Sequence, residues 1–353
     1  MREKLSPILA IEEVSLFCFS ILIREDIYMA LTKEDLRQAA HSALVQCMAV
    51  SSGESVLIIT DEELREVGYA FWEEAKKLGA EAIIMEMAPR SQDGEEPPWP
   101  VARIMSMVDV VLAPTSRSLS HTLARRQANA AGARIASMPG ITKDSMIRTL
   151  NADYSRIARL SENVAQILSV GKFARITSPG GTDITMSLEG RISQPDGGIY
   201  HMPGDFGNLP AGEAFIAPVE GTAEGILVVD GAMSGVGALE DAIRMKVESG
   251  YVTEITGGAG AGILEESITH LGKHARNIAE LGVGTNDRAM ITGKVLEDEK
   301  VLGTVHLALG NNIGFGGIID VPIHLDGIML KPTLLIDDKA VIVDGVLQVK
   351  ERC

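Results

Sequence analysis

The chain has 353 residues, 46% of them hydrophobic and 23% charged, which is the composition of a globular protein and excludes wholesale disorder. Asp and Glu number 48 against 32 Lys and Arg, giving a formal net charge of -16. A field this negative repels phosphate backbones and anionic membrane surfaces and attracts cations. We therefore expect no nucleic acid and no membrane among the partners, and metal ions become plausible ligands.

The N-terminus and the cysteines bear on the compartment. Cys18, Cys47 and Cys353 have neither a disulfide-framework spacing nor a zinc-ligand spacing, which is typical of a reducing compartment such as the cytoplasm. The apolar run 15–23 is too short to span a bilayer. Met29 opens the segment MALTKEDL, which reads like a natural start, so we interpret residues 1–28 as an N-terminal extension.

Residues 29–171 alternate helix and strand patterns. Thr32 with Asp35 three residues later predicts a cap for a helix to about residue 50, and Ser118 is interpreted as the cap of a later helix. Short apolar runs predict strands at 55–59, 82–85, 107–112 and 134–136, with helices at 61–78, 118–131 and 152–170. This alternation predicts an α/β domain with a doubly wound parallel sheet. No glycine-rich nucleotide-binding motif follows any of these strands.

Glycine marks a change of architecture, because only 7 of the 36 glycines precede residue 172. The remainder, 172–353, is predicted to be a mostly antiparallel β-rich domain. Its strand candidates are 182–188, 214–218, 225–229, 305–309 and 333–336. Residues 265–279 carry a regular apolar face and predict one packed helix.

The second half contains residues suited to metal binding. His324 and Asp326 are two positions apart, so in a strand they project from the same face and suit one metal or two neighbouring metals. His306 lies in another apolar strand candidate, and Glu213 and Glu280 lie at the ends of predicted elements. Mixed Glu, His and Asp ligands on separate elements are the set that two divalent ions need.

Four segments occur in order: GEAFIAP, ELGVGTN, LEDEKVLGTVHLALG and HLD. Together they resemble the aminopeptidase T family of dinuclear metallopeptidases, over most of residues 172–353. The resemblance implies a homodimer that removes N-terminal residues from peptides with a water activated by two divalent ions, such as Zn, Co, Mn or Mg. It also implies a set of metal ligands, of which Glu213 or Glu280 doubles as the general base: Glu213, Glu280, His306, His324 and Asp326.

The chain departs from that family at one position. The family has a tyrosine seven residues after the histidine of the GTVH-type motif, where it assists the tetrahedral intermediate, and here that position is Ile313. A non-catalytic metal-binding homologue is therefore an alternative. Tyr200, His201 and Asp183 are further candidates for substrate contacts, because they lie in or next to glycine-rich loops expected near the cleft.

A second group is similar in length, in the segment TAEGILVVD and in HLD: the 2,5-dihydroxypyridine ring-cleaving dioxygenases. This resemblance implies a single ferrous ion and a ring-cleaving oxygenase. Those enzymes lack acidic residues matching Glu213 and Glu280, so their presence here favours the two-metal hydrolase.

Two other clusters are weaker candidates. His270 and His274 are one helical turn apart, and we interpret them as part of a solvated face. Ser116, Ser120 and His121 resemble a hydrolase cluster, but no G-x-S-x-G elbow surrounds them.

Overall fold

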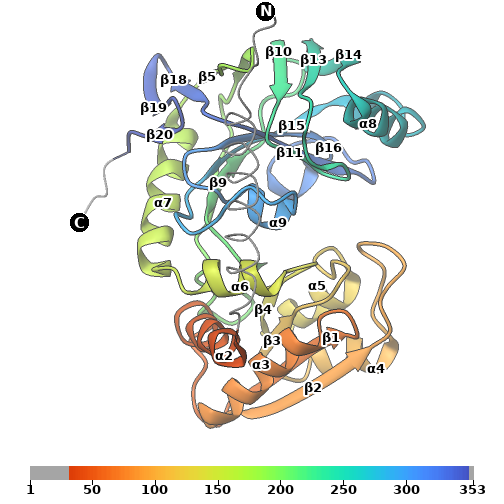
Figure 1. Cartoon of the computed structure of the whole chain (residues 1–353), viewed down its shortest axis with the longest axis vertical. Coiled ribbons are helices and arrows are strands. Elements are labelled where there is room, and N and C mark those ends of the chain that lie inside the picture. Colours follow the sequence, from red (N-terminus) through yellow and green to blue (C-terminus); the bar gives the residue numbers. More distant parts are fainter. Residues whose placement is uncertain (1–31, 350–353) are drawn as a thin grey trace, which may run out of the picture.

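A computed structural model describes residues 32–349, so the predicted extension at 1–28 lies outside the described residues. The chain forms one five-stranded parallel sheet with helices and two larger antiparallel sheets (Figure 1). The α/β half and the β-rich half lie at opposite ends of the long axis, and α7 (Tyr154–Val170) runs along the β-rich half (Figure 1). Both predicted sheet types are confirmed.

The parallel sheet has the order β2-β1-β3-β4-β8, where β8 is Phe206–Asn208, and every pairing is parallel. One face packs against α2, α3 and α6, and the other packs against α4 and α5, so the sheet is doubly wound as predicted. The elements of this half are α2 (Lys33–Ser42), η1 (Ala43–Cys47), β1 (Ser55–Asp61), α3 (Arg65–Lys77), β2 (Glu81–Met87), α4 (Trp99–Met105), β3 (Val110–Ala113), α5 (Leu123–Ala130), β4 (Arg134–Ser137) and α6 (Lys143–Leu150).

Helix starts illustrate how local sequence determines these elements. Thr32 and Asp35 form the predicted capping box at the start of α2. The prediction of Ser118 as a cap is wrong, because α5 begins five residues later. Thr122 is its N-cap and accepts a hydrogen bond from the Arg125 amide. The Ser118 hydroxyl instead accepts from the amide of Ser120, within the loop before the helix.

A segment beyond residue 171 returns to the parallel sheet. Strand β8 (Phe206–Asn208) pairs in parallel with β4, and Tyr200, Leu209 and Ala211 pack into the core beneath α2 and α3. Residues 197–211 thus connect the two halves. The division of the chain at residue 171 stays a prediction.

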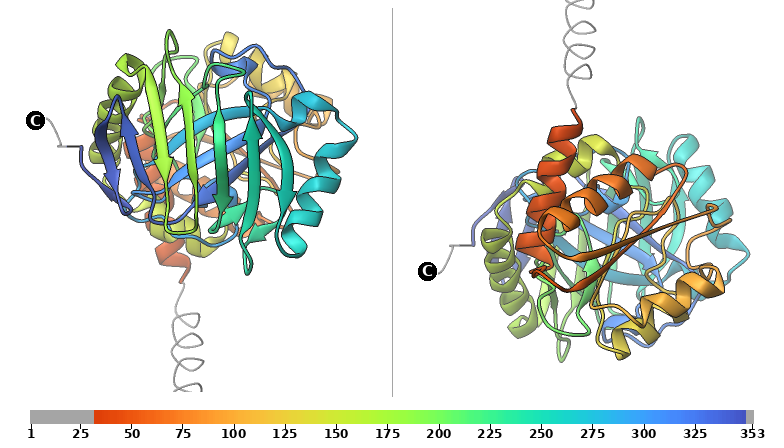
Figure 2. Two further views of the ribbon diagram at one scale, coloured as in Figure 1. Left: turned by 90° about the horizontal axis from the view of Figure 1, so that it is seen from above. Right: turned by 90° about the horizontal axis from the view of Figure 1, so that it is seen from below.

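The β-rich half is a sandwich of two antiparallel sheets with a shared apolar core. Figure 2 (left) looks onto the outer, eight-stranded sheet, with α8 at one edge and the C-terminal strands at the other. Its order is β14-β13-β10-β6-β5-β18-β19-β20. Those strands are β5 (Phe173–Thr177), β6 (Asp183–Ser187), β10 (Glu224–Val229), β13 (Ile243–Glu248), β14 (Tyr251–Thr256), β18 (Thr333–Ile336), β19 (Lys339–Val343) and β20 (Val346–Leu347).

The inner, seven-stranded sheet lies between the outer sheet and the α/β half (Figure 1). Its order is β12-β11-β17-β16-β15-β9-β7. Its elements are β7 (Gln194–Asp196), β9 (Glu213–Ile216), β11 (Ala232–Met233), β12 (Gly237–Ala238), β15 (Ile278–Gly284), β16 (Val305–Gly310) and β17 (His324–Met329), with α9 (Val295–Asp298) and η3 (Ile313–Phe315) in its connections.

The bounds predicted for the packed helix, 265–279, are wrong. The helix α8 spans Ala259–Thr269 and is followed by the short 3-10 turn η2 (Lys273–Arg276). Gly272 has a φ of 77°, which interrupts the helix although the apolar spacing continues through it. Ile278 belongs to strand β15, so Glu280 lies within a strand and not at the end of a helix.

Among the helices of residues 32–349, none has the length and apolar character needed to cross a bilayer.

Candidate metal centre

Four neighbouring strands of the inner sheet carry the five predicted ligands. Glu213 begins β9, Glu280 lies in β15, His306 in β16, and His324 and Asp326 in β17. The strand pairings place Ala308 between Glu280 and Asp326, so these two carboxylates flank it on adjacent strands. The structure therefore brings together residues that are up to 113 positions apart, from Glu213 to Asp326.

Alternation along each strand directs these side chains to one face. In β16 the residues Val305, Leu307 and Leu309 belong to the sandwich core, so His306 projects from the opposite face. In β15 the register shifts by one residue between Ile278 and Glu280. This bulge allows Ile278 to face the core while Glu280 still faces the site, a common use of bulges next to functional groups.

The imidazole of His306 occupies space that only a glycine leaves open. Gly282 of β15 is its register partner, and a Cβ on Gly282 would lie 1.9 Å from His306 Nε2. His306 is fully buried. Gly282, the first glycine of the segment ELGVGTN, is therefore required to leave room for His306.

The ligand atoms form three overlapping groups, each with its atoms within 4.8 Å of one another. The groups are Glu213–Glu280–His306, Glu280–His324–Asp326 and Glu299–His306–Asp326. Glu280 is shared by the first two: its Oε1 lies 3.3 Å from His306 Nε2 and its Oε2 lies 3.2 Å from His324 Nε2. This carboxylate therefore places one oxygen at each of two groups of potential metal ligands.

A backbone carbonyl orients His324. Its Nδ1 lies 2.8 Å from the Asn311 carbonyl oxygen, which can only accept, so Nδ1 carries the hydrogen. Nε2 is then the nitrogen that faces Glu280 and Asp326, whose Oδ1 lies 3.3 Å away, and it would hold a cation when deprotonated. Such a carbonyl partner is the usual means of fixing the tautomer of a metal-binding histidine.

Three further charged residues belong to this cluster and were missed in the sequence. The ammonium of Lys300 donates to Glu213 Oε1 at 2.5 Å and to Glu299 Oε1 at 2.6 Å, and Asp196 Oδ2 lies 3.9 Å from it. Glu299 and Lys300 lie in the segment LEDEKVLG, where an acidic run suggests a solvated surface. Nothing in a single sequence indicates that this lysine is buried.

The charges shift the pKa of the ligands. Burial alone would lower the pKa of His306, but its hydrogen bond with Glu280 and the charges of Glu213 and Glu280 raise it to about 9. Burial would raise the pKa of Asp326, yet His324 holds it well below its usual range. Burial raises the pKa of Glu299 to about 8, against the opposing effect of Lys300. These shifts show that the charged groups of the cluster interact strongly with one another.

The donor set fits divalent metal ions. With neutral histidines, five largely buried carboxyl groups (Asp196, Glu213, Glu280, Glu299 and Asp326) face one ammonium, so negative charge exceeds positive charge even when Glu299, with its pKa of about 8, is protonated. Divalent cations would balance this excess. Within residues 32–349, the buried Glu213 Oε2 has no hydrogen-bond donor and lies 3.3 Å from His306 Nε2. Oxygen and imidazole donors of this kind suit borderline and hard divalent ions.

Tyr200 and His201, predicted to contact substrate, have different hydrogen-bond partners. The Tyr200 hydroxyl lies 2.7 Å from Asp196 Oδ1 and 2.8 Å from the Asn208 carbonyl, so it touches the cluster only through Asp196. His201 is exposed and bonds the Gln46 carbonyl at 2.8 Å. The roles of both as substrate contacts stay predictions.

Asp183 is not brought to the cluster, which corrects the expected placement. It lies on β6 of the outer sheet and forms an exposed ion pair with Arg175 at 3.0 Å. Its neighbour Ile184 faces the sandwich core, so Asp183 points away from the inner sheet. The strand expected at 182–188 is present as β6, but a sequence does not reveal which sheet a strand joins.

Two aromatic rings border the ligands. Phe315 of η3 makes edge-to-face contacts with His324, at 5.8 Å between ring centroids, and with Phe215 of β9, at 5.5 Å. Ile313, at the position of the family tyrosine, is 54% exposed. The cluster thus has an apolar aromatic flank that sequence reasoning missed.

The loop before α5 contains the weaker serine–histidine candidates. Burial lowers the pKa of His121, and the charges of Arg125 and His324 lower it further. Ser116 and Ser120 bond Asp61 and Asn208, which leaves no serine–histidine pair at this loop among the described residues. His270 and His274 are exposed and belong to none of the three metal-ligand groups, in agreement with a solvated face.

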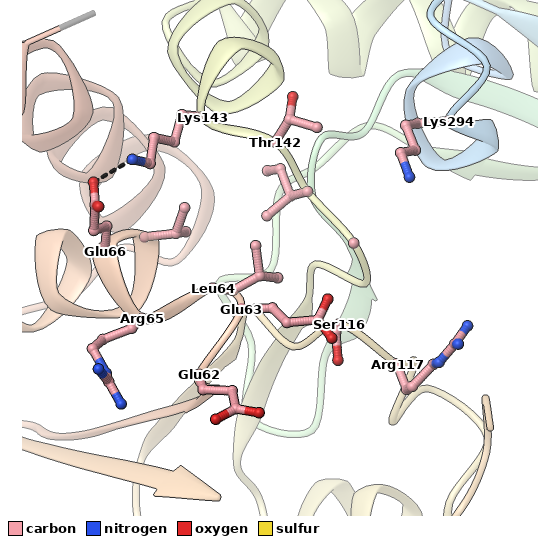
Figure 3. Close-up of a pocket in the computed structure, with 13 residues that line it drawn as sticks. Glu62, Glu63, Leu64, Arg65, Glu66, Ser116, Arg117, Thr142, Lys143 and Lys294 are labelled. Atoms are coloured by element: carbon pink, nitrogen blue, oxygen red, sulfur yellow. Dashed lines mark hydrogen bonds and ion pairs between the residues drawn. The ribbon is translucent and has the colours of Figure 1, made fainter. Parts of the chain in front are cut away.

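A separate hollow of about 630 Å³ lies at the carboxyl edge of the parallel sheet (Figure 3). The segments after β1, β3 and β4 line it, and Lys294 reaches it from the β-rich half. In Figure 3 the Lys143–Glu66 ion pair closes one side. None of the predicted ligands lines this hollow.

The fold and the ligand cluster define the class: an enzyme of a metal-dependent type. The chain belongs to the 2,5-dihydroxypyridine 5,6-dioxygenase (NicX) family, whose sequence model matches residues 35–349. A curated relative described as 2,5-dihydroxypyridine 5,6-dioxygenase, from Pseudomonas putida KT2440, is 27% identical over 197 residues. That match spans 51% of this chain and 55% of the relative, about half the length of each.

Two solved structures share the fold. A 2,5-dihydroxypyridine dioxygenase from Pseudomonas putida KT2440 superposes with a TM-score of 0.77 at 21% identity, covering 91% of this chain and 99% of that one. Wild-type AmpT from Thermus thermophilus gives a TM-score of 0.67 at 17% identity, covering 90% and 100%. At these identities the likeness concerns the fold alone, and it agrees with both resemblances found in the sequence.

Proposed function

We propose that the chain is a two-metal hydrolase that removes N-terminal residues from short peptides, in the manner of the aminopeptidase T family. The observation that carries this proposal is the position of Glu280, one oxygen at each of two histidines, in two complete three-ligand groups. A single-ion centre needs neither Glu213 nor a shared Glu280, and both add buried negative charge, of which Lys300 compensates only part.

Each ligand has a distinct role in this proposal. Glu213, Glu280 and His306 would hold one ion, and Glu280, His324 and Asp326 would hold the second. The two ions would supply Lewis acidity, which polarises the scissile carbonyl and makes a water molecule acidic enough to react near neutral pH. Glu280 is one candidate to take the proton of that water, through an oxygen that does not hold an ion. Glu213 is the other candidate base.

The flank of the site predicts a slow reaction. No tyrosine follows Tyr251 in the chain, and Ile313 offers no hydroxyl to a developing oxyanion. Loss of one such donor typically costs about 10²–10³ in kcat. Lys300 remains as a buried donor, but both of its short hydrogen bonds are to carboxylates of the cluster.

A mononuclear iron dioxygenase that cleaves a hydroxylated ring is the second candidate. The family match favours it, and so does the aromatic pair Phe215–Phe315, which would suit a planar ring beside His324. Two histidines with one carboxylate, here His306, His324 and Asp326, are the ligand types of non-haem ferrous oxygenases.

One paired experiment separates the two candidates. The metal-free full-length chain is loaded either with Co²⁺ or, anaerobically, with Fe²⁺. It is then given leucine-containing di- and tripeptides in one assay and 2,5-dihydroxypyridine with oxygen in the other. The hydrolase proposal predicts release of free leucine that a chelator abolishes and that Glu213→Gln removes. Oxygen uptake with the pyridine, retained in Glu213→Gln, would establish the dioxygenase, and no turnover in either assay would leave a non-catalytic metal-binding protein. Sedimentation of the same samples tests the expected homodimer.

A further inference from the structure

A buried cation lies inside the ring of carboxylates. Lys300 follows α9 and is 1% exposed. Its Nζ donates to Glu213 Oε1 at 2.5 Å and to Glu299 Oε1 at 2.6 Å, with Asp196 Oδ2 at 3.9 Å. An ammonium is retained at such depth only when carboxylates compensate the loss of its hydration. Its charge is therefore a fixed part of the centre.

Among the residues that the structure describes, Lys300 forms ion pairs with members of only two of the three ligand groups. Glu213–Glu280–His306, here the inner position, contains one carboxylate bound to Lys300, and so does Glu299–His306–Asp326. Glu280–His324–Asp326, here the outer position, contains none that forms an ion pair with Lys300 within the described chain. The His324 side chain is also 31% exposed, whereas His306 is fully buried.

We infer that Lys300 makes the two metal positions unequal, so that the outer position binds its ion first and tightly and the inner position binds second and more weakly. This inference rests on the proposed two-metal function. Lys300 occupies Glu213 Oε1 and leaves Oε2, the atom without a hydrogen-bond donor, directed at His306 Nε2. It thus positions Glu213 as a one-oxygen ligand and opposes the arrival of a second cation.

The size of the effect follows from charge in a poorly hydrated site. Unit charges a few ångströms apart interact by several kcal/mol at the effective dielectric of a protein, so we expect the second step to be at least about 10-fold weaker than the first. Part of the repulsion is offset by Glu299 and Asp196, which share the ammonium.

The test is a titration of the metal-free full-length chain with Co²⁺ alone. Binding is monitored by calorimetry and by the visible absorption of the bound ion. We expect two resolved steps. Glu213→Gln should remove the weaker step and leave the tighter one, and His324→Ala should do the reverse. These readouts concern binding and do not depend on turnover.

Lys300→Gln isolates the charge, because the amide keeps a donor towards Glu213 while the positive charge is lost. We expect the ratio of the dissociation constants of the two steps to fall by about 10-fold, mainly because the second ion binds more tightly. Lys300→Met is the second variant and should change this ratio in the same direction. Lys172→Gln is the matched control: Lys172 pairs with Glu189 on the exposed side of the outer sheet, and its loss should leave both steps unchanged.

The outcomes distinguish this inference from the function on which it rests. The role of Lys300 is overturned if the wild type binds its two ions with equal affinity. It is also overturned if the difference in affinity persists in both Lys300 variants. Neither result contradicts the two-metal hydrolase. A weaker second step in Lys300→Gln also overturns the role of Lys300, since the ammonium would then assist the inner position. A wild type that binds a single Co²⁺ removes the two-metal function itself.

Discussion

Gly282 offers the most direct structural perturbation of the centre. Replacing it with alanine adds one carbon on β15, and that carbon would lie 1.9 Å from His306 Nε2 and 2.2 Å from Cε1. Contacts below 3.0 Å do not occur for real Cβ atoms, so either the imidazole or the strand must move. His306 is fully buried in the central strand β16, between β15 and β17, which leaves it little room to retreat.

The cost can be estimated from packing. Inserting a methyl group into a filled interior typically costs about 1–3 kcal/mol, and a displaced His306 would also lose its contacts with Glu213 and Glu280. Both groups that contain His306 would then lack their nitrogen ligand, whereas Glu280–His324–Asp326 would remain. We therefore expect Gly282→Ala to bind about one ion where the wild type binds two, and to lose peptide hydrolysis.

The assay is elemental analysis of the metal-loaded variant, with thermal unfolding of the same sample. Gly262→Ala is the matched control, because Gly262 lies in α8 with nothing within 4 Å of its added Cβ. That change should keep full metal content and raise stability by about 0.5–1 kcal/mol. Full metal content in Gly282→Ala would refute the assignment of His306 as a ligand.

Four other variants test separate residues of the structure. His324→Ala and Asp326→Ala should each remove one bound ion with little unfolding, as elemental analysis and circular dichroism can establish; full metal content in both would contradict the assignment. Ile313→Tyr should raise the rate of peptide hydrolysis, by up to about 10²–10³ if the hydroxyl reaches the oxyanion, and an unchanged rate would count against the family alignment there. Burial would raise the pKa of Glu54, but its hydrogen bonds from Arg134 lower it below the ordinary value of 4.5. The ion pair therefore stabilises the fold at pH values above 4.5, and this stabilisation is lost as the pH falls and Glu54 becomes protonated. Arg134→Met should thus cost about 1–3 kcal/mol at pH 7 in urea unfolding, and the difference from wild type should shrink as Glu54 becomes protonated at acidic pH.

The sequence predicted much of the centre because its ligands lie in strongly patterned strands. The alternation in VHLALG directs His306 away from the core, and HLD places His324 and Asp326 on one face. The resemblance to a dinuclear family connected these residues with Glu213 and Glu280. Strand order could not be derived in this way, because pairing depends on contacts between distant segments.

The errors have equally local causes. Apolar spacing continued past Gly272, so a helix and the following strand looked like one helix, although the left-handed backbone at that glycine ends the helical run. Asp183 has the expected alternation but belongs to the outer sheet. Lys300 appears in an acidic run as an ordinary surface residue, and only the folded arrangement of Glu213 and Glu299 around it reveals a buried cation.

The central claim is that two divalent ions share Glu280 and support hydrolysis, and metal content measured together with peptide turnover on one preparation tests it most directly. The account predicts two ions per wild-type chain with chelator-sensitive release of N-terminal residues. It also predicts fewer bound ions and no turnover in Glu280→Gln, which keeps the shape of the side chain but removes its charge. A wild type with one iron per chain and no peptide release, or a Glu280→Gln variant with unchanged metal content and turnover, would contradict it.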